Sequence, residues 1–143
     1  MAFKFEIGHG KRTAHLEADV ESMLGKKLGD KIPGDEISSN MAGYELEITG
    51  ASDKAGFPSA KEIEGPGMKR KLLTKGFSFH KLKKKKKTAD RKKISKGMRK
   101  RRTVRGNTIS QDTVQINLKV LKEGSKKFDE VFPIKQKAEQ PAA

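Results

Sequence analysis

The sequence predicts a mainly β protein, built as a small antiparallel β-barrel with one short helix and a basic extension. Apolar and polar residues alternate in several short stretches, which is the pattern of half-buried strands. Glycine, proline and other turn formers separate these stretches at roughly 8–12-residue intervals, as in small barrels and sandwiches. The third observation is a lysine- and arginine-rich segment without periodicity. The 143 residues are enough for one domain of ordinary size.

The N-terminal part predicts a hairpin followed by a helix. Phe3, Phe5 and Ile7 alternate with charged residues, so a strand is expected there, and residues 13–18 are a second strand across a glycine-flanked turn. Asp19 is a plausible N-cap. A short amphipathic helix should follow it and end at Gly29, because apolar residues recur at helical spacing at Val20, Met23, Leu24 and Leu28.

The middle of the chain contains the clearest strand. Residues 30–39 include Pro33-Gly34 and are expected to form a loop anchored by Ile32 and Ile37. Tyr44, Leu46 and Ile48 then alternate with polar residues, which predicts a strand. Residues 50–58 follow as a loop of turn formers, in which two glycines suggest positive φ or a close approach of the backbone.

The second half predicts fewer elements. A short strand is expected at residues 71–74, and Phe77 and Phe79 alternate around Ser78. Order should resume near Thr103-Val104, and residues 114–120 form another alternating strand before a turn at 122–124. A last packed segment is expected at Phe128, Val131, Phe132 and Ile134.

Charge is segregated along the chain. Residues 69–105 hold 19 of the 33 lysines and arginines and one of the 18 acidic residues, so this segment carries +18 and the remainder carries −3. So many uncompensated charges repel one another unless a polyanion neutralises them. The sequence therefore predicts a binding partner with a phosphate backbone, and nucleic acid is the favoured class.

The residues expected to contact nucleic acid fall in two groups. The lysines are mobile point charges, whereas each arginine is a planar fork that grips phosphate with two hydrogen bonds and stacks on bases. A glycine beside the last arginine would allow the backbone to approach a phosphate, or would simply form a turn. The predicted contacts are Lys69, Arg70, Lys71, Lys83, Lys84, Lys85, Lys86, Lys87, Arg91, Lys92, Lys93, Arg99, Lys100, Arg101, Arg102, Arg105 and Gly106.

The composition argues against several other functions. There is no cysteine, which excludes disulfides and zinc–cysteine sites. His9, His15 and His80 have no partner at metal-ligand spacing, and no carboxylate pair stands out, so neither a metal, a cofactor nor an enzyme is expected. The N-terminus lacks the apolar block of a signal peptide, and no apolar run is long enough to span a membrane, which predicts a soluble cytoplasmic protein.

Three stretches resemble a known family. They are Gly50-Ala51-Ser52-Asp53-Lys54-Ala55-Gly56-Phe57-Pro58, then Arg101-Arg102-Thr103-Val104-Arg105-Gly106, then Val114-Gln115-Ile116-Asn117-Leu118 with Lys122-Glu123-Gly124. In this order and spacing, over nearly the whole chain, they resemble the small-subunit ribosomal protein family S6e of archaea and eukaryotes. The loop that carries the first motif has Asp53, Lys54, Gly56, Phe57 and Pro58.

The resemblance implies a β-barrel body and a structural role, bound to rRNA and to neighbouring ribosomal proteins of the small subunit in the cytoplasm. It implies no catalysis and no homo-oligomer. Ser59 stands where the family usually has methionine, and the lysine-rich stretch is longer than usual. The long C-terminal helix of the eukaryotic members is absent, so the chain resembles the short archaeal form, and their regulation by kinases is not transferred.

The expected organisation is one β-barrel body of residues 1–80 and 103–134, a basic rRNA-binding extension of residues 81–102, and a flexible tail of residues 135–143. Charge alone equally permits a DNA-packing protein of chromatin type, because phosphate contacts carry no sequence information. A DNA-binding protein would be favoured by a recognition helix or a dimer motif, and neither is evident in the sequence. A polybasic membrane-surface protein would need a lipid anchor or a basic amphipathic helix, and neither is evident.

Overall fold

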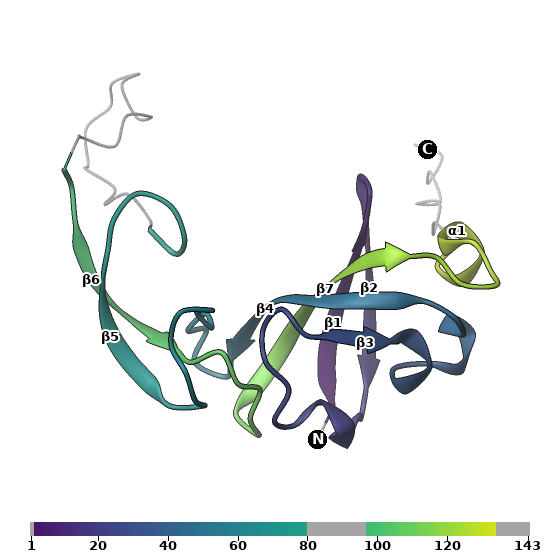
Figure 1. The fold of residues 1–143 in the computed structure, drawn as a ribbon, viewed down its shortest axis with the longest axis horizontal. Coiled ribbons are helices and arrows are strands. Elements are labelled where there is room, and N and C mark those ends of the chain that lie inside the picture. The colour runs from purple at the N-terminus through teal and green to yellow at the C-terminus, as the bar shows by residue number, and fades with distance from the viewer. Residues whose placement is uncertain (1, 80–96, 134–143) are drawn as a thin grey trace, which may run out of the picture.

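The computed structural model describes residues 2–79 and 97–133 and shows a mainly β protein with one short α-helix (Figure 1). The described strands form a five-stranded sheet and a separate two-stranded ribbon. Part of the predicted interface lies outside the described residues, as do Ile134 and the predicted tail at 135–143. The predicted contacts in that part are Lys83, Lys84, Lys85, Lys86, Lys87, Arg91, Lys92 and Lys93.

The five-stranded sheet has the order β2-β1-β7-β4-β3. Its strands are β1 (Phe3–His9), β2 (Arg12–Ala18), β3 (Lys31–Pro33), β4 (Glu45–Asp53) and β7 (Thr113–Lys122). All neighbours are antiparallel except β1 and β7, which pair in parallel, with Phe5 opposite Ile116. The N-terminal hairpin and the two later alternating strands are thus confirmed.

Alternation along these strands builds the main core. Phe5, Ile7, Leu46, Ile48 and Ile116 are at most 1% exposed, while the residues between them lie toward solvent or are partly covered. Because every second side chain of a strand points to the same face of a sheet, these apolar side chains lie together in one core cluster. Each fully buried aliphatic or aromatic side chain contributes about 1.5–3 kcal/mol relative to its exposed state.

The two-stranded ribbon consists of β5 (Met68–Leu73) and β6 (Lys100–Arg105), paired antiparallel from Met68 opposite Arg105 to Leu73 opposite Lys100. It curves away from the five-stranded sheet (Figure 1). A second, smaller cluster packs against its inner side, with Val104 fully buried. This cluster contains Ala60, Leu73, Phe79 and Val104, with Ile63 and Met98 partly buried against them.

Isolated bridges connect the ribbon to the sheet. Ser52 of β4 pairs with Pro58, and Ser59 pairs with Arg105 of β6. The Ala60 N–H also donates to the Arg105 carbonyl at 2.9 Å. Residues 58–60 therefore act as a short backbone link between the last residues of β4 and the last residue of β6.

Several predictions need correction. Neither sheet closes on itself, so the barrel is not confirmed, and the β1–β7 pair makes the main sheet mixed rather than antiparallel. Residues 31–33, predicted as loop, form β3. Regular structure after the lysine-rich stretch was predicted to resume near Thr103, but β6 already begins at Lys100.

The predicted helix after Asp19 is wrong. Only a 3-10 turn, η1 (Glu21–Met23), forms there, and its N-cap is Val20. Gly25 adopts a φ of +84°, and its N–H donates to the Ile109 carbonyl at 3.0 Å, so the backbone leaves the helical path after one turn. The apolar spacing still marks buried positions, because Val20 and Met23 pack in the main core.

Short helical turns complete the fold. Two further 3-10 turns, η2 (Gly34–Glu36) and η3 (Ser39–Met41), connect β3 to β4. The α-helix α1 (Phe128–Val131) follows β7 and buries Phe128, which confirms the predicted last packed segment as far as Phe132. The Tyr44 hydroxyl donates to the Lys126 carbonyl at 2.6 Å and ties this end to the core.

Candidate nucleic-acid interface

A buried ion pair fixes the place where the ribbon leaves the sheet. The Arg105 Nε donates to Asp53 Oδ2 at 2.7 Å, and the two side chains are 12% and 3% exposed. A second guanidinium nitrogen of Arg105 donates to Asp112 Oδ2 at 3.1 Å, and another donates to the Pro66 carbonyl at 3.1 Å. One arginine side chain thus joins the last residue of β4, the loop before β5 and the loop before β7.

The loop after β4 is built around the same aspartate. Asp53 Oδ1 accepts a hydrogen bond from the Phe57 N–H at 2.8 Å, and the Asp53 N–H donates to the Phe57 carbonyl at 3.1 Å. Gly56 closes the turn with a φ of +81°, a conformation that L-residues with a side chain rarely adopt. Residues 54–57 therefore form a tight, internally bonded turn, whereas residues 50–53, predicted as part of the same loop, belong to β4.

The charges of this pair stabilise each other. Burial raises the pKa of Asp53, but the hydrogen bonds from Arg105 and from the Phe57 N–H outweigh it and hold the pKa of the carboxyl below its ordinary value. The hydrogen bond to Asp53 raises the pKa of the Arg105 guanidinium. Both groups are therefore charged near neutral pH.

These contacts give Arg105 a structural role that sequence reasoning missed, and they give Gly106 a structural reason of the kind that it had left open. A Cβ on Gly106 would lie 1.7 Å from the Gly65 carbonyl oxygen, so the glycine is required by the close approach of the loop before β5. Arg105 is occupied by carboxylates of its own chain, and its predicted contact with nucleic acid stays a prediction. No signal in the sequence links Arg105 to Asp53, which lies 52 residues away.

The ribbon and the residues that flank its strands are rich in cations that have no carboxylate partner in the described part of the chain. Residues 68–75 and 97–105 contain nine lysines and arginines and no acidic residue. Of these nine, only Arg105 and Lys71 form ion pairs within the described residues, and Lys71 pairs with Glu62. The other seven are Lys69, Arg70, Lys75, Arg99, Lys100, Arg101 and Arg102, and all but Lys100 and Arg102 are classed as exposed.

The five-stranded sheet differs in this respect. Many of its cations are matched by a carboxylate across the sheet or from a neighbouring element. Lys4 lies against Glu17, Arg12 contacts Asp129, and Lys122 lies 3.0 Å from Glu45. Unmatched positive charge is thus concentrated on the ribbon, which agrees with the charge segregation of the sequence.

The pairing within the ribbon increases this repulsion. Lys71 lies directly opposite Arg102, and like charges in that position destabilise a sheet. Arg101 lies opposite Leu72, which is 46% exposed, and Arg70 lies opposite Thr103. The ribbon therefore brings together Lys69, Arg70, Lys71, Lys100, Arg101 and Arg102 from segments about thirty residues apart, and a bound polyanion would relieve their repulsion.

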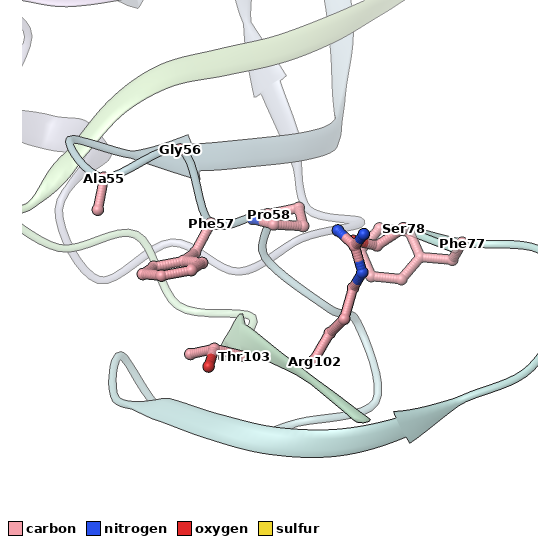
Figure 2. Close-up of a pocket in the computed structure, with 8 residues that line it drawn as sticks. All are labelled: Ala55, Gly56, Phe57, Pro58, Phe77, Ser78, Arg102 and Thr103. Atoms are coloured by element: carbon pink, nitrogen blue, oxygen red, sulfur yellow. The ribbon is translucent and has the colours of Figure 1, made fainter. Parts of the chain in front are cut away.

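A slot lies beside the ribbon where the motif loop faces β6 (Figure 2). Its volume is about 490 Å³. The Phe57 ring and the Arg102 side chain lie on opposite sides of it, with Pro58 between them at one edge (Figure 2). The lining residues are Ala55, Gly56, Phe57, Pro58, Phe77, Ser78, Arg102 and Thr103.

Within the described residues there is no cluster of three or more histidine, cysteine or acidic side chains that could hold a metal ion. None of the helices in this part of the chain is long and apolar enough to cross a membrane. The described His9 and His15 each lie within 4 Å of a glutamate, Glu123 and Glu6 respectively. His80 lies outside the described residues.

Fold and surface together define a class of protein: a mainly β scaffold that presents a ribbon of unpaired cations suited to a phosphate backbone. Comparison with known proteins gives the family. Residues 4–133 match the family model of ribosomal protein S6e, so the chain belongs to the ribosomal protein S6e family.

Individual relatives agree with this assignment. A small ribosomal subunit protein eS6 from Methanoculleus marisnigri is 43% identical over 76% of this chain and 72% of its own length. The protein of the same name from Methanothermobacter thermautotrophicus is 37% identical over 92% of this chain and 96% of its own length. The protein of this name from Methanocaldococcus jannaschii is 38% identical over 90% of this chain and 89% of its own length. The resemblance seen in the sequence is confirmed, including its archaeal type.

Proposed function

We propose that this protein is a structural component of the small ribosomal subunit in the cytoplasm, and that it binds rRNA through its polybasic segment. The observation that carries the proposal is a ribbon on which most cations lack a carboxylate partner among the described residues, in a chain whose relatives are named small ribosomal subunit proteins. Phosphate neutralisation supplies most of the affinity of such a surface.

The proposed assignment of residues to a body, an extension and a tail is the one predicted from the sequence. Residues 1–80 and 103–134 form the body, residues 81–102 form the rRNA-binding extension, and residues 135–143 form a tail. The position of β6 adds a refinement, because Lys100, Arg101 and Arg102 stand on a strand paired with β5. Their side chains therefore start from a fixed backbone, which suits placement on a defined RNA shape.

The proposed partners are small-subunit rRNA and neighbouring ribosomal proteins, without a cofactor, a metal or a catalysed reaction. We expect no homo-oligomer and no membrane association. The runner-up, a DNA-packing protein, shares the electrostatic argument but has no observation of its own in its favour. A-form RNA is recognised by shape and by its 2′-hydroxyls, which directional arginine forks can contact.

Co-sedimentation with small ribosomal subunits tests the proposal. The tagged full chain is expressed in an archaeal host, and its salt-resistant association with gradient-purified subunits is measured. Replacing Lys69, Arg70 and Arg101 with glutamine should release the protein at lower salt than wild type. The matched control replaces the exposed Lys11, Lys31 and Lys119 of the body with glutamine, which removes the same charge.

The control variant should co-sediment like the wild-type protein. Equal release of both variants would show that net charge, not the ribbon, sets binding. Sedimentation with DNA-containing fractions and not with small subunits would overturn the proposed function and favour the DNA-packing alternative.

A further inference from the structure

We propose that the slot beside β6 holds one unstacked RNA base, stacked between the Phe57 ring and the Arg102 guanidinium, with Phe77 at its rim. The inference rests on the proposed function and names the RNA feature that the body recognises: a bulged or looped-out nucleotide beside a helix. RNA-binding proteins commonly stack such bases on aromatic rings and arginine planes.

The shape of the slot fits this occupant. Its volume of about 490 Å³ lies within the roughly 300–1,000 Å³ range of pockets that hold small organic molecules. Phe57 of the motif loop and Arg102 of β6 line opposite sides of the slot (Figure 2). The Phe57 backbone is fixed by two hydrogen bonds to Asp53, so one wall is in place before a ligand arrives.

The second wall carries an unused hydrogen-bond donor. Among the described residues, the Arg102 Nε is buried and has no hydrogen-bond partner. A buried N–H without an acceptor is unfavourable, and groups of this kind point to a missing partner. A ribose or phosphate oxygen of a nucleotide whose base occupies the slot is a suitable acceptor for this donor.

The rim residue is exposed by the local backbone. Ser78 has a φ of +55°, which is uncommon for a residue with a side chain, and the Phe79 N–H closes the turn on the Gly76 carbonyl at 3.2 Å. The turn buries Phe79 in the second cluster and leaves Phe77 53% exposed. A large aromatic side chain held at the surface beside a slot is available for stacking.

The charge around the slot favours a nucleotide over an aromatic side chain of another protein. Lys75, Arg99 and Arg101 are exposed on the neighbouring segments, and the sequence continues from Phe79 into the lysine-rich residues 81–87. A nucleotide whose base enters the slot also carries phosphates, which exposed cations nearby in the sequence attract. A neutral protein side chain would leave the cations unneutralised.

Two short RNA hairpins test the inference with the full chain. One carries 2-aminopurine as a single-nucleotide bulge, and the other carries it paired within an uninterrupted stem. Because stacking on an aromatic ring quenches 2-aminopurine fluorescence, the wild-type protein should quench the bulged base and bind that hairpin about tenfold more tightly than the uninterrupted one.

Phe77→Ala and Phe57→Leu should abolish both the preference and the quenching while retaining affinity for the uninterrupted hairpin. Phe77 is half exposed, so its loss does not disturb the core, and circular dichroism checks the fold of Phe57→Leu. Met68→Ala is the matched control, since Met68 is 54% exposed on the ribbon but does not line the slot. It should behave as wild type.

The outcomes separate the two proposals. Binding of neither hairpin at low salt would overturn the proposed function and the inference together. Equal binding of both hairpins, or equal weakening of both by Phe77→Ala, would overturn the inference and leave the proposed function standing. A bulge preference that survives Phe77→Ala and Phe57→Leu, with poorer incorporation into subunits, would assign the slot to a protein neighbour and also overturn it.

Discussion

Replacing Asp53 with asparagine should destabilise the fold by about 2–3 kcal/mol. Removing one partner of a buried ion pair typically costs about 3–5 kcal/mol, because the other charge is left without compensation. Here the cost is reduced, since Arg105 keeps its 3.1 Å contact with Asp112. The amide oxygen of asparagine can also still accept the hydrogen bond from the Phe57 N–H.

Urea unfolding followed by far-ultraviolet circular dichroism measures this change, with the free energy of unfolding extrapolated to water. The matched control is Asp112→Asn at the other end of the same guanidinium. Asp112 is 55% exposed, so its replacement should cost less than about 1 kcal/mol. A double-mutant cycle of Asp53→Asn with Arg105→Gln should give a coupling energy of at least about 1 kcal/mol.

The reasoning is refuted if Asp53→Asn unfolds within about 0.5 kcal/mol of wild type, or if the cycle shows no coupling. Either result would mean that the ion pair does not hold the junction of sheet and ribbon. Arg105 would then be free to act as the RNA contact that the sequence predicted.

Three further predictions concern the same elements. The pKa of Asp53 is lowered in the folded state, so the unfolded chain binds a proton at this group more readily. The stability that this group contributes should therefore be lost as the pH falls below the ordinary aspartate pKa of about 4 toward the lower folded pKa. The urea midpoint of Asp53→Asn should accordingly change less with acid pH than that of the wild-type protein. Gly106→Ala, whose Cβ would lie 1.7 Å from the Gly65 carbonyl oxygen, should lower the free energy of unfolding by about 2 kcal/mol or more. Gly67→Ala, whose Cβ would meet no atom within 4 Å, should change that free energy by less than about 0.5 kcal/mol. Finally, affinity for structured RNA should fall by roughly 10³–10⁵ between about 50 and 200 mM salt if six to ten phosphates are neutralised, and a flat titration would remove the electrostatic account.

Local alternation was enough to predict the strands of the main sheet other than β3. Phe3, Phe5 and Ile7 predict β1 because every second side chain must be buried on one face. The same reasoning failed after Asp19, where the apolar spacing correctly marks buried residues but Gly25 and its hydrogen bond to Ile109 prevent a helix. Tertiary contacts override local preference at such a point.

Long-range pairing could not be read from the chain. The parallel pairing of β1 with β7 joins residues more than a hundred positions apart, and no turn signal specifies it. Within the basic segment, only a short strand at residues 71–74 and renewed order near Thr103 were predicted, because the lysine-rich stretch between them lacks periodicity. The two ends of the basic segment nevertheless pair as β5 and β6, since Leu73 and Val104 pack on a separate small core that single-strand patterns do not reveal.

The candidate interface was predicted in composition but not in detail. Charge segregation identifies the segment, because electrostatics depends on the sum of charges rather than on their exact placement. A sum of charges cannot distinguish Arg105, which is bound to Asp53 and Asp112, from Arg101, which is exposed. The slot between Phe57 and Arg102 likewise depends on a contact between segments 45 residues apart.

Ultraviolet cross-linking of intact small subunits that contain this protein tests the central claim most directly. After nuclease and protease digestion, mass spectrometry identifies the peptides that carry nucleotides. Cross-links should map to residues 69–77 and 97–103, with β2 and the residues around α1 free of them. Cross-links confined to β2 or to residues 125–133, with none on the ribbon, would contradict the assignment of the β5–β6 surface to rRNA.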